Sequence, residues 1–509
     1  ATRTPLVPRG AGSSMAGGAI GPGVVVDLSR RRSIGVVDVE TRSVRVDPGA
    51  LCGDVDAAAR ARGLRFPVAP SSAAFCTIGG MAATNAAGAP SLRHGAIRAW
   101  VRALDCVFDD GSRAELRRGA APPGAAPAVA RFLTDAPALR SEELEHPSMH
   151  FGVRKESSGY ALGDWAQSGE LVDLMVGSEG TLALFVGIEL ALTPAAPMTA
   201  SLLGAFDSLE AAVEATTAAR ELGVSACELL DRTFLDVARA GGAVAVPAGA
   251  EAVLLVELEG EDVAHTRALA EEVAQAFRIA GASDVVVALD DASAHDLWAL
   301  RHAASPILSR LDPQVRSMQF IEDGAVPPDR LPEYVRGVRD TLARHELRGV
   351  LFGHAGDGHV HVNPLVDVSR PDWRARVESV LDEVTGLVAR LGGTLAGEHG
   401  DGRLRAPLLD RCWSQASLAR FALVKGAFDP RGIFNPGVKV PLPRQRPLGD
   451  IKYDPTLPPL PIAARRALDR VERERGYAMD RLALLESSAR GAPPTRPSGT
   501  AVSPPAVID

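Results

Sequence analysis

CTIGGMAATNAAG, residues 76–88, is rich in glycine and hydroxyl side chains and follows the pair Ser71-Ser72. Two similar segments stand in the first half of the chain, PRGAGSS at 8–14 and GSEGTL at 177–182. Their glycines permit positive φ, and successive backbone amides in such loops bind phosphate oxygens. One glycine loop is weak evidence. Three in one region indicate a long ligand that carries a pyrophosphate.

These loops differ from the common nucleotide-binding signatures. PRGAGSS is not followed by the GK[ST] of a Walker loop, and it is not a clean GxGxxG ahead of a long helix. A dinucleotide site of the ordinary Rossmann type is therefore not our first expectation.

The composition is that of a multidomain globular protein. With 509 residues, 46% of them hydrophobic, the chain can bury two or more cores. A net charge of −8 without any basic run argues against binding of nucleic acid. The five cysteines are odd in number and widely spaced, which suits reduced thiols better than a disulfide framework.

Neither secretion nor a membrane span is indicated. The sequence has no leader of charged and apolar residues and no run of about 18 apolar residues. We expect a cytoplasmic protein, with peripheral association at the inner face of the membrane left open. The sequence does not indicate an oligomeric state.

Three regions differ in texture. Residues 1–196 combine glycine and alanine with short Val/Ile runs, which predict strands at 23–28, 34–39, 43–46, 101–108 and 182–192 and a helix at 54–62. Residues 197–440 alternate helices predicted at 208–222, 263–279, 292–311 and 331–345 with strands at 252–259, 284–289 and 317–322. This alternation is typical of an α+β domain with an antiparallel or mixed sheet. Residues 441–509 predict a Pro-rich linker, one charged helix near 462–485 and a disordered tail.

Two motifs late in the second region gather histidines, HAGDGHVHVN at 354–363 and GEHGDG at 397–402. The apolar run before His354 predicts a strand, and the alternation after a tight turn predicts a returning strand. His359, His361 and Asn363 would share one face of it, so that His354 meets His361 across the hairpin. The clustering indicates a metal site with a base beside it.

The order of the motifs along the chain resembles that of the FAD-linked 2-hydroxy-acid dehydrogenases and oxidases. These motifs are PRGAGSS, TIGGM, TNAAG, GSEGTL, the two histidine motifs and FNPG at 434–437. The chain looks most like the D-lactate, glycolate and D-2-hydroxyglutarate dehydrogenases of the vanillyl-alcohol-oxidase flavoprotein superfamily, over roughly residues 5–440. The resemblance implies an α+β fold class. A two-subdomain FAD-binding domain of the vanillyl-alcohol-oxidase/PCMH type would occupy residues 1–196. A ferredoxin-like α+β cap for substrate and metal would occupy residues 197–440, and its C-terminal end would contact FAD.

By the same resemblance the glycine loops would line FAD, with Asn435 close to the isoalloxazine. The residues concerned are Arg9, Gly10, Ala11, Gly12, Ser13, Ser14, Pro70, Ser71, Thr77, Ile78, Gly79, Gly80, Thr84, Asn85, Gly88, Glu179, Gly180 and Asn435. Members of the family carry a leading βαβ-like segment before the PRGAG loop that this sequence lacks. On this interpretation the sequence is a fragment or comes from a truncated gene model, and we expect weaker retention of FAD.

Oxidation of a 2-hydroxy acid to the 2-oxo acid removes the hydroxyl proton while a hydride leaves C2 for the flavin. A divalent cation held by two imidazoles and one carboxylate keeps positions open for substrate oxygens and lowers the hydroxyl pKa. We predict His354, His361 and Glu398 as ligands, which also matches the family motif, for zinc first and for manganese or iron as alternatives. His399 is the predicted general base, with a pKa tuned near neutrality. His359 stands where many members carry Asn and is a competing ligand.

RKESSGY at 154–160 resembles the R-K-x-x-[TS]-G-Y segment that meets substrate in the family. A planar guanidinium suits a carboxylate, so Arg154 is predicted to bind the substrate, with Ser158 and Asn363 assisting. A solvated basic loop is the alternative. The chain has only four lysines, so a further lysine for the second carboxylate of D-2-hydroxyglutarate is not evident.

The resemblance further implies that electrons pass to an iron-sulfur protein or domain, a quinone or a cytochrome rather than to NAD. Residues 452–455 resemble the lead-in to an iron-sulfur domain that is fused in some relatives and absent here. Three other functions are alternatives. A flavin-free structural subunit of a larger oxidase would be expected to lack the metal motifs, which this chain has. A metal-free flavin oxidase of the vanillyl-alcohol type shares the loops, and a metallohydrolase uses the same His/His/Glu set but does not need the loops.

Overall fold

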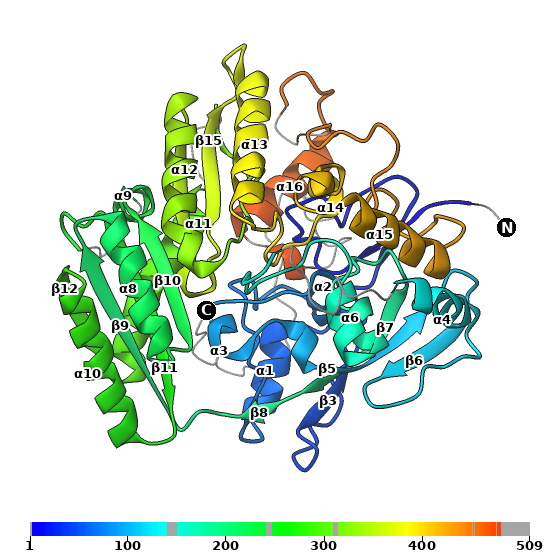
Figure 1. The fold of residues 1–509 in the computed structure, drawn as a ribbon, viewed down its shortest axis with the longest axis horizontal. Helices are drawn as coiled ribbons and strands as arrows, with labels where there is room; N and C mark the ends of the chain where they lie inside the picture. The colour runs from blue at the N-terminus through cyan, green and yellow to red at the C-terminus, as the bar shows by residue number, and fades with distance from the viewer. Residues whose placement is uncertain are drawn as a thin grey trace.

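The computed structural model describes residues 3–139, 150–240, 247–308, 314–449, 451, 454–474 and 476–479. The chain folds into two units, one blue to cyan in Figure 1 and one mainly green to yellow. The C-terminal part of the chain returns to the first unit.

A four-stranded antiparallel sheet in the order β3-β7-β5-β6 is the centre of the first unit. Its strands are β3 (Ser43–Val46), β5 (Val101–Val107), β6 (Arg113–Arg117) and β7 (Leu184–Ala191). One face of the sheet packs on helices α1 (Cys52–Arg60), α2 (Ile78–Thr84), α4 (Pro127–Leu139), α6 (Leu162–Ser168) and α7 (Leu171–Met175). The other face carries ion pairs such as Arg117 with Glu189. Apolar and charged side chains thus separate by the two-residue period of the strands.

Two small sheets and two short helices complete this unit. Strand β1 (Leu6–Arg9) pairs in parallel with β2 (Val24–Asp27), and β4 (Leu64–Arg65) pairs with β8 (Thr193–Pro194). Helix α3 (Ser91–His94) and the 3-10 turn η1 (Ile97–Trp100) follow α2.

The second unit contains a seven-stranded antiparallel sheet in the order β12-β9-β11-β10-β14-β15-β13. Its first half consists of β9 (Met198–Phe206), α8 (Leu209–Glu221), β10 (Ala226–Asp231), β11 (Ala252–Gly260), α10 (Val263–Ile279) and β12 (Ala282–Ala288). Numbered within this half, the strands lie in the order 4-1-3-2, which is the ferredoxin-like βαββαβ arrangement. Helices α8 and α10 are capped by the residues before them, Ser208 and Asp262, whose side chains accept hydrogen bonds from the backbone N–H three residues on.

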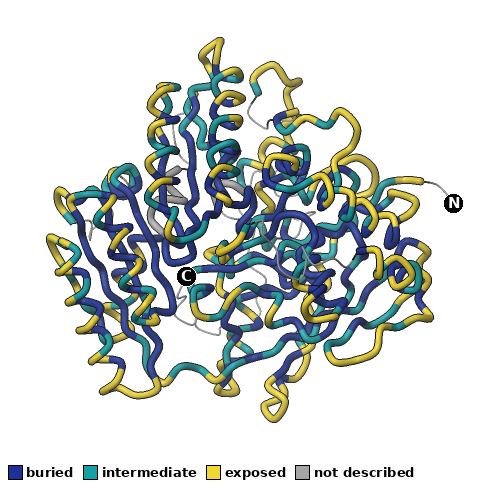
Figure 2. The backbone as a smooth tube through the Cα atoms, in the orientation of Figure 1, coloured by how far each residue is buried: buried dark blue, intermediate teal, exposed yellow. Residues whose placement is uncertain are grey.

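The second half of this sheet carries the histidine hairpin. It comprises β13 (Val315–Ser317), α12 (Leu331–Arg344), β14 (Arg348–His354), β15 (His361–Asp367) and α13 (Trp373–Arg390). Helices α8, α10, α12 and α13 share one apolar core on one face, while α9 (Arg232–Ala240) and α11 (Asp291–Leu308) cover the opposite face. Figure 2 shows these strands as buried and the outer sides of the helices as exposed. Because both faces are covered, a polar side chain on the sheet is held away from water.

The chain returns to the first unit after α14 (Gly402–Arg405) and η4 (Ala406–Arg411). Helix α15 (Gln415–Phe428) buries Phe421 and Phe428 in the core of the first unit, where Phe428 stacks on Phe132 at 5.0 Å between ring centroids. Asn435 donates its backbone N–H to Leu6 of β1. Later still, α16 (Ile462–Glu474) leads to η5 (Gly476–Ala478), whose Tyr477 stacks on Phe75.

The expected α+β fold class is confirmed, and three predicted elements differ from the structure. The predicted strand at 34–39 forms only isolated bridges, Ile34 with Val46 and Asp38 with Ser43, because no continuous partner lies beside it. The predicted strand at 317–322 is limited to β13, since the chain turns away from the sheet and carries Glu322 toward the histidines. Helix α16 ends at Glu474, and the rest of the predicted C-terminal helix and the predicted disordered tail lie largely outside the described residues.

Candidate active site

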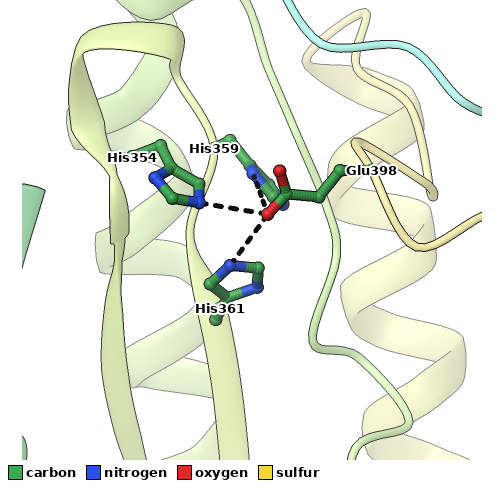
Figure 3. Close-up of side chains that lie close together, drawn as sticks. All are labelled: His354, His359, His361 and Glu398. Carbon is green, nitrogen blue, oxygen red and sulfur yellow. Dashed lines mark hydrogen bonds and ion pairs between the residues drawn. The ribbon is translucent and has the colours of Figure 1, made fainter. Parts of the chain in front are cut away.

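The two histidine motifs meet at the end of strand β14. Phe352 pairs with His361 in the register of β14 and β15, and the rings of His354 and His361 lie 5.4 Å apart between centroids. The short turn η3 (Ala355–Asp357) between them permits this approach. The predicted contact of His354 with His361 across the hairpin is therefore present. Glu398, from the loop after α13, points into the same space (Figure 3).

One carboxylate oxygen, Oε1 of Glu398, lies among three imidazoles. It is 3.0 Å from Nε2 of His354, 3.3 Å from Nε2 of His361 and 3.9 Å from Nδ1 of His359. Ligand atoms around a tetrahedral zinc ion, each about 2.0–2.1 Å from the metal, lie about 3.3 Å from one another. The first two separations match that spacing, and the four ligand atoms all lie within 4.8 Å of one another.

The second nitrogen of each imidazole contacts an acceptor. Nδ1 of His354 contacts the carboxylate of Glu228, and Nδ1 of His361 contacts the backbone oxygen of Glu322 at 3.0 Å. Nε2 of His359 contacts Asp323 at 3.0 Å. If each of these nitrogens carries the proton, the nitrogens that face Glu398 have free lone pairs, which is the arrangement of metal-bound histidines.

His359 has a buried nitrogen atom without a hydrogen-bond partner. Its Nδ1 is buried and makes no hydrogen bond within the described part of the chain. Burial lowers the pKa of His359 to about 4, so the ring is neutral near pH 7 and can act as a ligand. The residues present thus fit a divalent metal ion, with His359 as a third imidazole near the set predicted from the sequence.

Buried cations balance the carboxylates of the cluster. Nζ of Lys155, 3% exposed, lies 3.2 Å from Oε2 of Glu398 and 3.6 Å from Asp357. Burial by itself raises the pKa of Glu398, but Lys155 and His354 outweigh it and hold that pKa well below its usual value. Nε of Arg301 donates to Glu228 at 2.7 Å. Glu398 is therefore ionised and ready to bind a cation.

His399 stacks on His361 at the side of the cluster, with ring centroids 5.2 Å apart and an angle of 14°. Its Nδ1 contacts Oε2 of Glu322 at 2.7 Å, and its side chain is 30% exposed, unlike the buried ligand residues. Burial lowers the pKa of His399, but Glu322 and Asp323 raise it more, to about 10. The pKa near neutrality expected from the sequence is therefore not the value that these protein groups alone produce.

Glu322, Asp323, His361 and His399 form a second group of closely spaced ligand atoms. Arg405 already contacts it, through an ion pair with Glu322 and a distance of 3.5 Å to Asp323. A fixed guanidinium disfavours a metal ion there. We therefore assign Glu322 and Asp323 to holding imidazoles in place.

The three glycine loops lie together in the first unit. A Cβ atom on Gly10 would lie 2.2 Å from Oγ1 of Thr77, and one on Gly180 would lie 2.5 Å from Pro8. Only glycine permits these close approaches. Thr77 also caps helix α2 by accepting a hydrogen bond from Gly80 N–H at 3.2 Å.

The remaining residues predicted to bind FAD are placed on or beside these loops. Strand β1 is followed by Ala11, Gly12, Ser13 and Ser14. The turn before α2 contains Pro70 and Ser71, and α2 itself contains Ile78, Gly79 and Thr84. Asn85 ends α2 in the left-handed conformation, with φ 54°. The backbone oxygen of Gly88 lies 3.5 Å from Lys155, next to the histidine cluster. Nδ2 of Asn435 donates to Gly18 and Glu179 at 2.9 Å each.

Two polar side-chain atoms that belong to the loops have no hydrogen-bond partner within the described part of the chain. They are Nε of Arg9 and Oγ of Ser178, and both are buried. Buried polar groups are normally hydrogen-bonded, so a polar ligand at this place would satisfy them. The loops therefore fit a phosphate-bearing cofactor such as FAD.

A buried group of three charged side chains links the glycine loops to the histidine motifs. Nζ of Lys439 lies 3.1 Å from Glu179 and 3.0 Å from Asp401, and it donates to Ser157 O at 2.6 Å. Glu179 in turn accepts the backbone N–H groups of Asp401 and Gly402. The GSEGTL and GEHGDG segments, far apart in sequence, are thereby fixed against each other.

The residues predicted to bind substrate are only partly brought together. Nε of Arg154 lies 3.1 Å from Asp357, and the Arg154 side chain is 42% exposed. Asn363 is buried on β15, and its Oδ1 has no partner in the described residues. Oγ of Ser158 accepts a hydrogen bond from Trp413, and no described contact links it to the histidines.

Sequence reasoning missed several groups of the site: Lys155, Glu228, Arg301, Glu322, Asp323 and Arg405. Some signals were available. Glu228 is a charged residue within the apolar strand β10, and Glu322 and Asp323 are adjacent acids at the end of a predicted strand. A charge in an apolar strand predicts a buried, paired group.

Comparison with known proteins gives two family matches. Residues 1–117 match the FAD binding domain, and residues 196–438 match the FAD linked oxidases, C-terminal domain. Among the described residues no helix has the length and apolar character needed to cross a membrane.

Individual relatives cover most of the chain. The glycolate oxidase subunit GlcD of Escherichia coli (strain K12) is 30% identical over 443 residues, which are 86% of this chain and 79% of that protein. The D-lactate dehydrogenase of Anaerostipes hadrus is 28% identical over 446 residues, covering 86% of this chain and 84% of that protein. The solved structure of 4-ethylphenol oxidase from Gulosibacter chungangensis shares the fold, with a TM-score of 0.61, 15% identity and coverage of 87% of this chain and 85% of that one.

Proposed function

The chain belongs to the FAD-linked oxidase family, and we propose that it oxidises a D-2-hydroxy acid to the 2-oxo acid with the help of a divalent metal ion. The observation that carries the proposal is the set of His354, His361 and Glu398, with His399 beside it, fixed by buried ion pairs to the glycine loops. Bound FAD supplies the hydride acceptor, and the bound metal supplies a Lewis acid for the hydroxyl and carboxylate oxygens.

The protein holds the metal ligands in position before any ion binds. Glu228 fixes the ring of His354, and the Glu322 carbonyl fixes that of His361. Glu398 is anchored by Lys155. Such outer contacts typically change metal affinity by about 10- to 100-fold. Two imidazoles and one carboxylate would hold the ion and leave it open to substrate oxygen.

His399 is proposed to accept the hydroxyl proton through Nε2, because Nδ1 contacts Glu322. The carboxylates that raise its pKa also stabilise the imidazolium once the proton has arrived. Beside a bound divalent cation the ring would lose part of this stabilisation, since like charges repel, and its pKa would move back toward neutrality. Its partial exposure leaves room for a substrate.

The substrate carboxylate needs a cation of its own. We propose Arg154 for this role, with Ser158 and Asn363 as helpers. Two other cations, Lys155 and Arg301, lie nearer to the metal-ligand set. Lys155 contacts Glu398 directly. Arg301 donates to Glu228 through Nε, and Glu228 is its one described acceptor. A guanidinium can bind a carboxylate through two parallel hydrogen bonds.

We place D-lactate and glycolate ahead of D-2-hydroxyglutarate. Lys155, Lys425 and Lys439 are each engaged with protein carboxylates, and Lys452 lies outside the described residues. A second substrate carboxylate would thus find no free lysine in the described chain. We further propose an iron-sulfur protein, a quinone or a cytochrome as electron acceptor, because the glycine loops lack the Rossmann signature of an NAD site.

Anaerobic flavin bleaching tests the proposal. Protein supplied with FAD and zinc is mixed with D-lactate, L-lactate, glycolate or D-2-hydroxyglutarate, and flavin absorbance is followed without oxygen. We expect reduction by D-lactate or glycolate at least about tenfold faster than by the other two. Bleaching by none of the four, with FAD bound, would contradict the proposed substrate class.

Metal analysis tests the ligand assignment separately. Glu398→Ala should leave the protein folded and lower its zinc content after gel filtration, whereas Glu383→Ala, on the exposed side of α13, serves as control. His359→Asn asks whether the third imidazole is a ligand: retained zinc would assign His359 to a supporting role. Full zinc occupancy in Glu398→Ala would instead refute the assignment of Glu398 as a ligand. A metallohydrolase would hydrolyse its substrate without any flavin bleaching.

A further inference from the structure

Two of the five free cysteines stand directly opposite each other. Leu51 and Thr77 form an isolated antiparallel bridge, and Cys52 and Cys76 are the next pair in that register. The backbone N–H of Cys52 donates to the oxygen of Cys76 at 3.1 Å. Residues paired in this way have Cα atoms about 5.5 Å apart, within the range of about 4.4–6.8 Å that a disulfide spans.

The two thiols also interact with each other. Each thiol is the largest influence on the pKa of the other, raising that of Cys52 and lowering that of Cys76, while the Cys52 thiol donates to the backbone oxygen of Val68 at 3.4 Å. For Cys106 and Cys227, burial is the main influence, it raises the pKa, and no second cysteine takes part. Cys76 is 7% exposed, whereas Cys106 in the same core is fully buried. Cys76 is thus a buried thiol of lowered pKa with a second thiol beside it, and a lowered pKa favours the thiolate that reacts with oxidants.

We propose that Cys52 and Cys76 form an oxidisable dithiol that hydrogen peroxide converts to a disulfide. The sulfur of Cys76 attacks one peroxide oxygen, so that an S–O bond forms, the O–O bond breaks and one water leaves. The sulfur of Cys52 then attacks the sulfur of Cys76, the S–S bond forms, the S–O bond breaks and a second water leaves with the remaining thiol proton. Two thiols lose two electrons in total, and the peroxide gains them.

The position of the pair gives the bond a structural consequence. Cys52 begins helix α1, and Cys76 precedes Thr77, which caps α2 and touches Gly10 of the first glycine loop. A disulfide would join the starts of two helices that flank the FAD loops. It would restrict the unfolded chain and so raise thermal stability. The inference does not depend on the substrate proposed above.

Peptide mapping tests the proposal on the wild-type chain. The FAD-supplied protein is treated with hydrogen peroxide, alkylated with N-ethylmaleimide in denaturant and digested with trypsin without reduction. Cleavage after arginine places Cys52 in peptide 46–60 and Cys76 in peptide 66–93. We expect these two peptides to appear linked, two hydrogens lighter than their sum, and to separate after dithiothreitol. Peptide 103–113, which carries Cys106, is the matched control and should remain alkylated.

Several outcomes would overturn the proposal: both peptides alkylated separately after peroxide, Cys76 carried to sulfinic acid with Cys52 still alkylated, or linkage to another cysteine. A second measurement needs no mapping. Peroxide should raise the Tm of the wild type and of Cys106→Ser by about 5 °C, and it should leave that of Cys76→Ser unchanged. An unchanged wild-type Tm despite complete linkage would refute the stabilising role of the bond.

Discussion

Glu228 is the most informative residue to change, because its carboxylate serves the metal site without being a ligand. It is fully buried on β10, contacts Nδ1 of His354 and accepts from Arg301 at 2.7 Å. The pKa of Glu228 lies well below its usual value, since His354 and Arg301 outweigh the effect of burial, which raises it. Glu228→Gln keeps the shape of the side chain and removes its charge.

Two losses follow from this geometry. Arg301, 8% exposed, would remain buried without a counter-charge, which costs about 3–5 kcal/mol of unfolding free energy. His354 would lose the carboxylate that fixes its tautomer, which lowers metal affinity by about 10- to 100-fold, equal to about 1.4–2.7 kcal/mol.

Glu259 provides a matched control. It is also a buried carboxylate, 4% exposed, and it pairs with Arg65 and His94, with Nε of Arg93 4.0 Å away. It lies on β11 and makes no described contact with His354, His361 or Glu398. Glu259→Gln should therefore lose stability by a similar amount and keep its affinity for zinc.

Urea unfolding of metal-free protein measures the first loss, and competition for zinc with a chromophoric chelator measures the second. Wild-type zinc affinity in Glu228→Gln would refute the reasoning. An equal loss of affinity in Glu259→Gln would do so as well, because the effect would then reflect general destabilisation.

Three further changes have distinct expected outcomes. His399→Asn should slow flavin reduction about 10²-fold or more with FAD still bound, and unchanged single-turnover reduction would remove the base assignment. Burial lowers the pKa of His150, but Glu156 raises it more, to about 10, which is above the unfolded value of about 6.5. The pair of His150 and Glu156 therefore stabilises the folded state fully below about pH 6.5, and this stabilisation is lost as the pH rises to 10. Urea unfolding at pH 6, 8 and 10 should thus show a gap between wild type and His150→Gln that shrinks with pH, and a constant gap would contradict this. Gly10→Ala should reduce FAD retained after gel filtration, because the new methyl group would lie 2.2 Å from a threonine hydroxyl, whereas Gly124→Ala, with open space around it, should not.

Local patterns predicted the histidine hairpin well. The alternation from His359 to Asn363 and the tight turn before it follow from the two-residue period of strands, and the contact of His354 with His361 follows from them. Helix α10 was predicted with its observed bounds, 263–279, because a capping Asp262 and continuous helix formers define it locally.

The groups around the histidines could not be predicted in this way. Glu228, Glu322 and Arg405 reach the site from separate elements, and their spacing in sequence carries no periodic signal. The pKa of His399 also depends on these long-range neighbours. The sequence predicts a pKa near neutrality, whereas Glu322 and Asp323 raise it to about 10. The strand expected at 317–322 was shortened for the same reason, since its last residue, Glu322, and the residue after it, Asp323, turn to the imidazoles. Tertiary contacts outweighed local propensity there.

We propose that a metal ion at His354, His361 and Glu398 takes part in the oxidation of a 2-hydroxy acid by the flavin. Single-turnover flavin reduction by D-lactate or glycolate, measured before and after removal of metal with a chelator, tests it most directly. We expect the rate to fall at least about 10²-fold on removal and to return when zinc is added back, with FAD bound throughout. An undiminished rate in protein verified to be free of metal would contradict the claim.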